Sequence, residues 1–331
     1  MINKYFKFYA SCIPIKGFKR GVICDFRRGS IFYIPNSILE ILEEYSTKVI
    51  TELFNDYESQ SVILKKYFDF LIENELIFYT DDLDNFPEIN KRFIKPFEIN
   101  IVLLEIDNFD STKLNLFETQ QISQIGCSEL VLISHKNSII SLEKIMLMLD
   151  KSKIKTVTYF VDYKHFFEQK YTELSNAYLR LREIIVYNCP IDITMPNIKN
   201  VSFTNDSVET ILTKKISNTD DFLLNINGFL ESQEYNLFYN RRVFIDNDNN
   251  IKHSIEENEK YGMIKNQNLI EIISNNEFKK LWGISKNQIE VCKDCEYRYI
   301  CPDNRIPIVK GKDLYYHLTD CNYNPYTNLW Q

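Results

Sequence analysis

Four of the eight cysteines lie close together late in the sequence, at Cys292, Cys295, Cys301 and Cys321, with the spacing C-x2-C-x5-C-x19-C. A C-x2-C turn lets two thiolates converge on one centre, and two later cysteines can complete a four-sulfur site. Four thiolates are typical ligands of structural zinc and of iron–sulfur clusters, and the spacing alone does not choose between them. Disulfides are the less favoured alternative, because the chain has the features of a cytoplasmic protein. The sequence therefore predicts a metal centre on which the folding of this segment depends.

The remaining cysteines are isolated from one another and have apolar or β-branched neighbours: Cys12, Cys24, Cys127 and Cys189. This pattern predicts small, buried hydrophobic side chains. The four histidines are also scattered, so the sequence offers no Ser-His-Asp or Cys-His set for catalysis. His317 stands four residues before Cys321 and could neighbour the metal centre or replace one of its ligands.

The composition excludes several classes of function. The chain has 331 residues and a formal net charge of −7, whereas a binder of the nucleic-acid backbone should be basic. It contains neither G-x-G-x-x-G nor G-x-x-x-x-G-K-[ST], so we do not expect it to bind ATP or NAD by itself. No stretch approaches the roughly 18 to 20 apolar residues of a membrane span, and the first 20 residues form a poor signal sequence. We therefore expect a cytoplasmic protein with no membrane span and no nucleic-acid partner.

The first 85 residues combine short strands with helices. Segments rich in aromatic and β-branched residues predict strands over 6–15, 21–26, 30–35 and 75–80. Apolar residues at helical spacing predict three helices between the third and fourth of these strands, over 37–45, 49–57 and about 61–71. A polar stretch with two prolines, 81–96, then predicts a linker.

This order of three strands, three helices and a closing wing strand resembles the winged-helix recognition element of ribosomal-peptide (RiPP) maturation systems. The resemblance implies that the leader of a precursor peptide adds as a strand beside residues 30–34 and packs on the helix at 62–70. Two arginines in the preceding turn would attract an acidic leader. The residues predicted to contact the peptide are Ile31, Phe32, Tyr33, Val62, Lys65, Lys66, Arg27 and Arg28. The alternative is an ordinary winged helix that binds no guest.

Residues 97 to about 230 alternate apolar strands with helices, which predicts βαβ units and a parallel sheet. Strands are expected over 97–106, 128–134, 156–163 and 184–189, and helices over 141–150 and 168–184. Beyond this region, β-type runs on both sides of the polar segment 246–250 predict a hairpin. The fold class is therefore α/β.

The cysteine segment CKDCEYRYICPDNR follows that hairpin, a Gly262-Met263-Ile264 segment and Trp282. Together, over roughly residues 235–331, these features look like a SPASM domain, the cluster-binding extension of many radical S-adenosylmethionine peptide maturases. The resemblance implies one 4Fe-4S cluster held by the four clustered cysteines, with Zn²⁺ as the alternative. Full SPASM domains hold a second cluster. We expect that cluster to be absent, because Ser254 and Asn304-Arg305 stand where its cysteines are needed.

The βα region resembles a partial, degenerate radical-enzyme barrel. Functional barrels of that kind carry C-x3-C-x2-C after their first strand, where three thiolates hold the iron that cleaves S-adenosylmethionine. Here the first strand is followed by residues 109–126, which contain no cysteine. We therefore expect no radical activity and no S-adenosylmethionine. The whole chain looks most like the SPASM component of grasp-with-SPASM systems, which accompanies an ATP-grasp ligase and a short precursor peptide.

These resemblances predict three domains: a recognition-element-like domain at 1–85, a degenerate βα domain at 95–234 and a four-cysteine domain at 235–331. The implied function is that of an accessory protein in graspetide-type maturation, which binds the precursor peptide and works with a separate ATP-grasp ligase. One alternative is a peptide-modifying redox enzyme that uses its single cluster. Another is a zinc-stapled scaffold with no peptide partner.

Overall fold

The computed structural model describes residues 4–95, 97–191 and 196–331. The chain divides into two compact units, each built from separated stretches. The first unit comprises Met1–Phe93, Ile216–Leu237 and Ile284–Gln331, and the second comprises Ile94–Lys215 and Phe238–Gly283. These units cut across the three predicted domains, because the segment 235–331 contributes residues to both of them.

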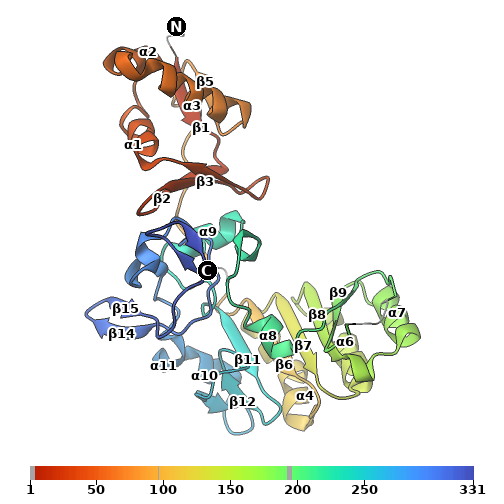
Figure 1. Ribbon diagram of the computed structural model, residues 1–331. Helices are drawn as coiled ribbons and strands as arrows, with labels where there is room; N and C mark the ends of the chain where they lie inside the picture. Colours follow the sequence, from red (N-terminus) through yellow and green to blue (C-terminus); the bar gives the residue numbers. More distant parts are fainter. Residues whose placement is uncertain (1–3, 96, 192–195) are drawn as a thin grey trace. The chain divides into compact units, whose positions relative to one another are not determined.

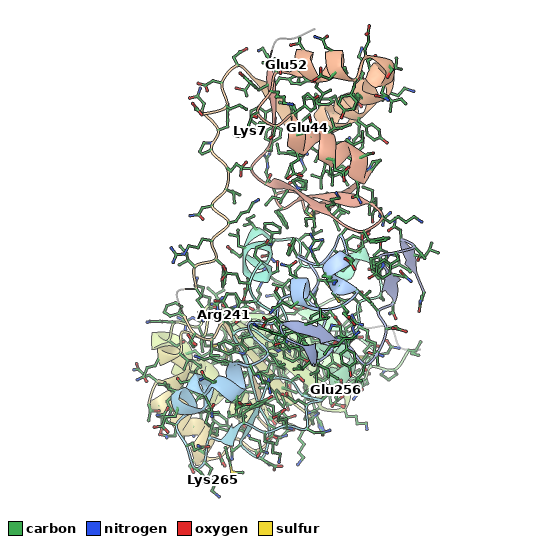
Figure 2. All side chains as sticks on the ribbon, turned by 90° about the vertical axis from the view of Figure 1, so that its left-hand side faces the viewer. Lys7, Glu44, Glu52, Arg241, Glu256 and Lys265 are labelled. Carbon is green, nitrogen blue, oxygen red and sulfur yellow. The ribbon has the colours of Figure 1, made fainter. Side chains whose placement is uncertain are left out.

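The N-terminal part of the first unit contains two small antiparallel sheets. Strands β1 (Tyr5–Phe8) and β5 (Ile77–Thr80) form one sheet. The other has the order β2-β3-β4, with the strands Cys12–Lys16, Gly21–Asp25 and Ser30–Ile34. The strand predicted over 6–15 is thus two strands separated by a turn. Lys7 of β1 lies beside the polar segment that follows β5, and its Nζ donates to the Leu83 carbonyl at 3.4 Å (Figure 2).

Three helices pack on one side of the β2-β3-β4 sheet: α1 (Asn36–Glu44), α2 (Ile50–Asp56) and α3 (Ser61–Glu73). Their apolar faces converge on one core, whose helical members include Ile38, Leu42, Leu53, Leu64, Phe68 and Leu71. The predicted helices therefore exist, at nearly the predicted bounds.

The C-terminal segment of the first unit packs on the other side of the same sheet (Figure 1). Strand β3 is buried along its whole length, because Ile23 faces the helical core whereas Val22 and Cys24 face the C-terminal segment. A strand covered on both faces should read as a continuous apolar run, and the segment GVIC does. The remaining helices here are η1 (Glu58–Gln60), η4 (Thr219–Asp221), α9 (Ile226–Ser232), η5 (Lys286–Gln288) and η6 (Cys292–Asp294).

Two short hairpins complete the first unit. Strand β14 (Ile308–Gly311) pairs with β15 (Leu314–Tyr316), and β16 (Tyr323–Asn324) pairs with β17 (Leu329–Trp330), both antiparallel. Because the C-terminal segment of the first unit contains little regular secondary structure, few ladder or helical hydrogen bonds stabilise it. Side-chain contacts must therefore position it.

The second unit is built on one large sheet with the order β10-β9-β8-β7-β6-β11-β12-β13. The strands from β10 to β11 are parallel, and β12 and β13 extend the sheet as an antiparallel edge. The strands are Ile101–Glu105 (β6), Glu129–Ser134 (β7), Thr156–Asp162 (β8), Leu181–Tyr187 (β9), Val201–Phe203 (β10), Arg242–Ile245 (β11), Asn250–Lys252 (β12) and Gly262–Met263 (β13). The predicted parallel α/β architecture is confirmed.

Helices connect these strands: α4 (Ser111–Glu118), α5 (Gln121–Gln124), α6 (Ile139–Met148), η2 (Leu149–Lys151), η3 (Tyr163–His165), α7 (Glu168–Ala177) and α8 (Val208–Leu212). Two further helices, α10 (Leu269–Ser274) and α11 (Asn276–Lys279), follow β13. The helix predicted over 168–184 is wrong beyond Ala177. Its last residues belong to β9, where Leu181, Ile184 and Val186 are buried in the sheet core. Pairing with β8 therefore overrides the helical spacing of these residues.

The predicted hairpin also exists, with Phe244 opposite Lys252 and Ile245 opposite Ile251. Its first strand pairs in parallel with β6, which explains why the hairpin belongs to the second unit and not with the cysteines. All four isolated cysteines are buried, as predicted. None of the helices in the described parts of the chain is long and apolar enough to cross a membrane.

Candidate metal centre

The four clustered cysteines converge within the first unit, although they come from different local structures. Cys292 opens η6, Cys295 directly follows it, Cys301 lies in the next loop, and Cys321 precedes β16. The pKa of the Cys301 thiol is raised, mainly because the thiol is desolvated, and the nearby Cys292 and Cys321 raise it further. Burial is likewise the main cause of the raised pKa of Cys292 and of Cys295. Cys295, Cys301 and Cys321 all pack against the same hydrophobic core of the first unit.

The backbone around these residues is folded tightly. The Cys295 N–H donates to the Cys292 carbonyl at 3.0 Å, which closes the C-x2-C turn. Val291, just before it, has a φ of +67°, an uncommon conformation for a β-branched residue. Two further amides point at sulfur: the Tyr297 N–H donates to Cys295 Sγ and the Tyr323 N–H donates to Cys321 Sγ, both at 3.4 Å. Such bonds favour the thiolate over the thiol.

Three charged side chains surround the sulfurs, and together they carry excess positive charge. Asp303 accepts from Lys286 Nζ at 2.6 Å and from Arg305 through two bonds of 2.9 Å, one to each carboxylate oxygen. Burial lowers the pKa of Lys286 and raises that of Asp303, but their mutual attraction outweighs both effects and keeps the pair charged. Arg305 also lies 4.0 Å from Cys292 Sγ.

The charge balance indicates what this site is built to hold. Lys286 and Asp303 are only 4% and 5% exposed, so their charges are poorly compensated by water. With protonated thiols, the two cations and one anion leave a net positive charge in the interior, which is costly. Four thiolates around a doubly charged centre would bring two negative charges and offset this excess. The residues present therefore fit a tetrathiolate metal or cluster site.

His317 is a further neighbour of the sulfurs. Its Nδ1 lies 3.2 Å from the Ile306 carbonyl, which only accepts, so the proton is on Nδ1. Burial, reinforced by Lys286, lowers the pKa of His317 to about 4, which leaves Nε2 with a lone pair at neutral pH. This Nε2 forms no hydrogen bond, although it lies 3.4 Å from Asp303 Oδ2 and within 4.8 Å of the Cys292 sulfur. His317 therefore lies next to Cys292, as one of the two alternatives for this residue expected.

The separation of the sulfurs bears on the size of the group that they could hold. A tetrahedral zinc ion with ligands at about 2.3 Å requires sulfurs about 3.8 Å apart. Among the described residues, the three donor atoms that lie mutually within 4.8 Å belong to Cys292, Asp303 and His317, and not to three cysteines.

The residues predicted to bind peptide on β4 face alternate sides of the sheet. Phe32 points to the helices and contacts Phe70 with ring centroids 6.2 Å apart. Ile31 packs instead against the core shared with the C-terminal segment. Tyr33 is 46% exposed, and its hydroxyl accepts from the Tyr297 hydroxyl at 3.1 Å. In the described part of the chain, β4 pairs with β3 alone, so its other edge offers unpaired backbone groups.

The other predicted peptide contacts lie at the surface. Val62, Lys65 and Lys66 are exposed and share the outer face of α3. Arg28 is already engaged, because it forms ion pairs with Asp25 and Glu75 and donates to the Asn74 carbonyl. Arg27 is exposed, and its guanidinium has no carboxylate partner among the described residues. The two arginines are therefore not equivalent.

Sequence reasoning missed the charged residues that complete this site, chiefly Lys286, Asp303, Arg305 and Glu296. Asp303 and Arg305 follow Cys301 within four residues, and a carboxylate and a guanidinium so close to a ligand are a readable signal. Glu296 directly follows Cys295 and gives the same kind of signal, whereas Lys286 gives none, because only the folded chain places it near the sulfurs.

We compared the chain with known proteins. No protein-family model matches it, and no curated protein sequence matches it significantly. Among solved structures, it is similar to the crystal structure of Streptococcus suis SuiB bound to S-adenosylmethionine. The alignment has 10% sequence identity and a TM-score of 0.31, and covers 90% of this chain and 94% of SuiB. A likeness this distant establishes no common function, so the functional argument rests on the residues of this chain.

Proposed function

We propose that this chain is an accessory, peptide-binding protein of a RiPP maturation system of the graspetide type, and that it works with a separate ATP-grasp ligase. The observation that carries this proposal is the convergence of the four cysteines within the unit that also contains the β4 edge. A half-buried, electropositive four-thiol site in the same unit as a strand with one unpaired edge suits a metal-stabilised peptide-binding module. The ligation chemistry would belong to the partner.

The metal centre is proposed to be one 4Fe-4S cluster on Cys292, Cys295, Cys301 and Cys321. The C-x2-C-x5-C-x19-C spacing and its resemblance to a SPASM domain support a cluster over zinc, and the surrounding cations would compensate the negative charge of either centre. When bound, the cluster would fix the C-terminal segment and supply a redox group. We expect anaerobically purified protein to be brown, with broad visible absorption and about one cluster per chain. Colourless protein with stoichiometric zinc, even after anaerobic reconstitution with iron, would exclude it.

Peptide binding is proposed to occur by strand addition at β4, with α3 forming the second wall. Backbone groups of Ser30–Ile34 would pair with the leader, and the outer face of α3, with Val62, Lys65 and Lys66, would contact its side chains. The test is calorimetric titration of the full-length protein with the precursor peptide encoded beside its gene. Binding of the leader part alone supports the proposal, whereas absence of binding by folded, metal-loaded protein contradicts it.

Radical chemistry is not part of the proposed function. Strand β6 is followed by α4 and α5, and the segment 109–126 that contains both helices has no cysteine to hold a cleaving cluster. We therefore expect no reductive cleavage of S-adenosylmethionine by the anaerobically reduced protein. Formation of 5′-deoxyadenosine above a control without protein would overturn this part of the proposal.

A further inference from the structure

The β4 edge and the cysteine segment are joined by a buried hydrogen-bond network. Two ligand cysteines are each followed, two residues later, by a tyrosine whose amide donates to the sulfur: Tyr297 to Cys295 and Tyr323 to Cys321. Both tyrosines are almost fully buried, at 1% and 3% exposure. The backbone amides of these tyrosines therefore contact the sulfurs directly, whereas their side-chain hydroxyls form other hydrogen bonds.

Those side chains meet around Arg20, which directly precedes β3. The Arg20 guanidinium donates to Glu296 Oε1 at 2.9 Å and to the Tyr297 and Tyr323 hydroxyls at 3.0 and 3.3 Å. The Tyr323 hydroxyl also donates to Glu296 Oε1 at 2.5 Å. Glu296 has no exposed surface, so these donors compensate for the burial of its carboxylate.

The same network ends on the edge strand. The Arg20 guanidinium lies 3.9 Å from the centroid of the Tyr33 ring, and the Tyr297 hydroxyl donates to the Tyr33 hydroxyl at 3.1 Å. One residue, Tyr297, therefore links Cys295 of the proposed metal site to Tyr33 of β4. A change in the state of the sulfur can reach the docking edge through the hydrogen bonds at the two ends of Tyr297.

We propose that occupancy of the four-cysteine site controls the order of the β4 edge, so that the metal-loaded protein is the form that binds an extended peptide. This inference rests on the proposed function. Metal binding converts each thiol to a thiolate, and hydrogen bonds to an ionised acceptor are roughly twice as strong as neutral ones. Loading thus fixes the tyrosine backbones, and their hydroxyls then hold Arg20 and Tyr33 in place.

An ordered edge loses less conformational entropy when a guest strand pairs with it, so loading raises peptide affinity. Couplings between sites typically change affinity about 5- to 150-fold, and by linkage the peptide then tightens metal binding by the same factor. The coupling can therefore be measured from either end, including in the absence of peptide.

The experiment compares full-length protein before and after removal of the metal by a chelator, using amide hydrogen exchange. We expect the amides of Ser30–Ile34 to exchange at least about tenfold faster in the metal-free form, within the usual range of coupling. Amides of β7, in the other unit, serve as the internal reference and should not change. Equal exchange of β4 in both forms overturns the coupling.

A matched pair of variants tests the path itself. Tyr33→Phe removes the hydroxyl that meets Tyr297 and keeps the ring under Arg20, whereas Tyr67→Phe removes a hydroxyl of α3 outside this network. We expect Tyr33→Phe to release metal to a chelator several-fold faster than Tyr67→Phe and the unmodified protein. Equal release rates overturn the proposal. If the protein binds metal but the release rates are equal, the coupling is wrong and the proposed metal centre is unaffected. If the protein binds no metal, both proposals are wrong.

Discussion

Charged and polar side chains cluster in two regions of the molecule, and the regions differ in whether these groups find hydrogen-bond and charge partners within the protein. One is the cysteine segment of the first unit, and the other is the carboxyl edge of the parallel sheet in the second unit. The second region lies where α/β sheets usually bind ligands. Position in the fold would therefore favour the sheet edge as the ligand-binding site. The contacts of the individual side chains favour the cysteine segment instead.

At the sheet edge, the charged groups satisfy one another. The Tyr187 hydroxyl donates to the Ser134 carbonyl at 2.9 Å, so the His135 Nδ1 at 3.1 Å from it must be the donor in that pair. The His135 Nε2 lies 3.3 Å from Glu105 Oε1, whose carboxylate raises the pKa of the ring. Both ring nitrogens are thus used within the protein, which leaves neither for a substrate.

The neighbouring groups of that edge are equally engaged. Asp107 accepts hydrogen bonds from the hydroxyls of Ser134 and Ser138 and from the amides of His135 and Lys136. Lys113 is fully buried and donates to the carbonyls of two loops, those of Asn108 and Asn247. This network ties loops together and requires nothing from outside.

The cysteine segment differs because its own side chains do not supply enough negative charge to balance its buried cations. Lys286 and Arg305 face the single carboxylate of Asp303, and the thiols are neutral when protonated, so positive charge is in excess. A charged cluster points to an external ligand when its charges and lone pairs are left uncompensated. Crowding of polar residues alone does not.

The largest effect should come from breaking the cysteine site. Replacing Cys301 by serine removes one thiolate, so we expect loss of stoichiometric metal and destabilisation of the first unit by more than about 4 kcal/mol, because metal binding and folding are coupled there. Metal analysis and thermal unfolding measure the two consequences.

The matched control is Cys189→Ser, a buried cysteine of the second unit whose thiol donates to the Val186 carbonyl at 3.2 Å. Serine keeps a donor at that position, so metal content should stay unchanged. If Cys301→Ser retains full metal content, the four-cysteine site is not the metal centre.

The next effect concerns the sheet edge. Lys113→Met keeps the apolar stem but leaves two buried carbonyls without their donor, so we expect destabilisation by about 3 kcal/mol. Metal content should be unaffected, because the residue belongs to the other unit. Chemical denaturation of the full-length variant gives the stability, and a loss of metal in the folded variant would contradict the separation of the two regions.

Much of the fold could be predicted from sequence, because local pattern encodes it. The apolar run GVIC and the alternating βα segments predict strands and helices that the structure contains, whereas the metal site predicted from the C-x2-C spacing stays a prediction. The error beyond Ala177 arose because Leu181 and Ile184 suit a helix or a buried strand, and only pairing with β8 decides between them.

The charged groups around the sulfurs could not be predicted in the same way. Lys286 meets Asp303 across 17 residues, and Arg20 meets Glu296 across 276, so neither pair leaves a local pattern. The sheet-edge network was missed for the same reason, since Glu105, His135 and Tyr187 come from three different strand ends. Contacts between distant segments depend on the tertiary fold, which periodicity does not report.

A smaller, pH-dependent effect on stability tests whether the charged groups of the sheet edge are paired with one another. Because the folded pKa of His135 is raised, its stabilising effect is fully present below the unfolded pKa of about 6.5 and is lost as pH rises through the folded value. Replacing His135 by glutamine should therefore cost about 1 kcal/mol near pH 6, after allowance for partial exposure, and little near pH 9. Unfolding by urea at the two pH values measures this difference, and an equal cost at both would contradict a charged His135.

The smallest expected effect separates the two arginines of the turn before β4. Arg27 carries a charge without a carboxylate partner among the described residues, whereas Arg28 is paired with Asp25 and Glu75. If an acidic leader docks at β4, Arg27→Ala should slow its association roughly threefold at low salt and have no effect at high salt, because exposed charges act mainly on the association rate. Arg28→Ala should instead lower the stability of the unit and leave the association rate nearly unchanged, since its charge is already neutralised. Stopped-flow binding at two salt concentrations, with unfolding measured in parallel, distinguishes the two residues. Equal effects of both variants on the association rate would mean that the ion pairs of Arg28 do not persist in solution, and the docking edge would then carry both charges.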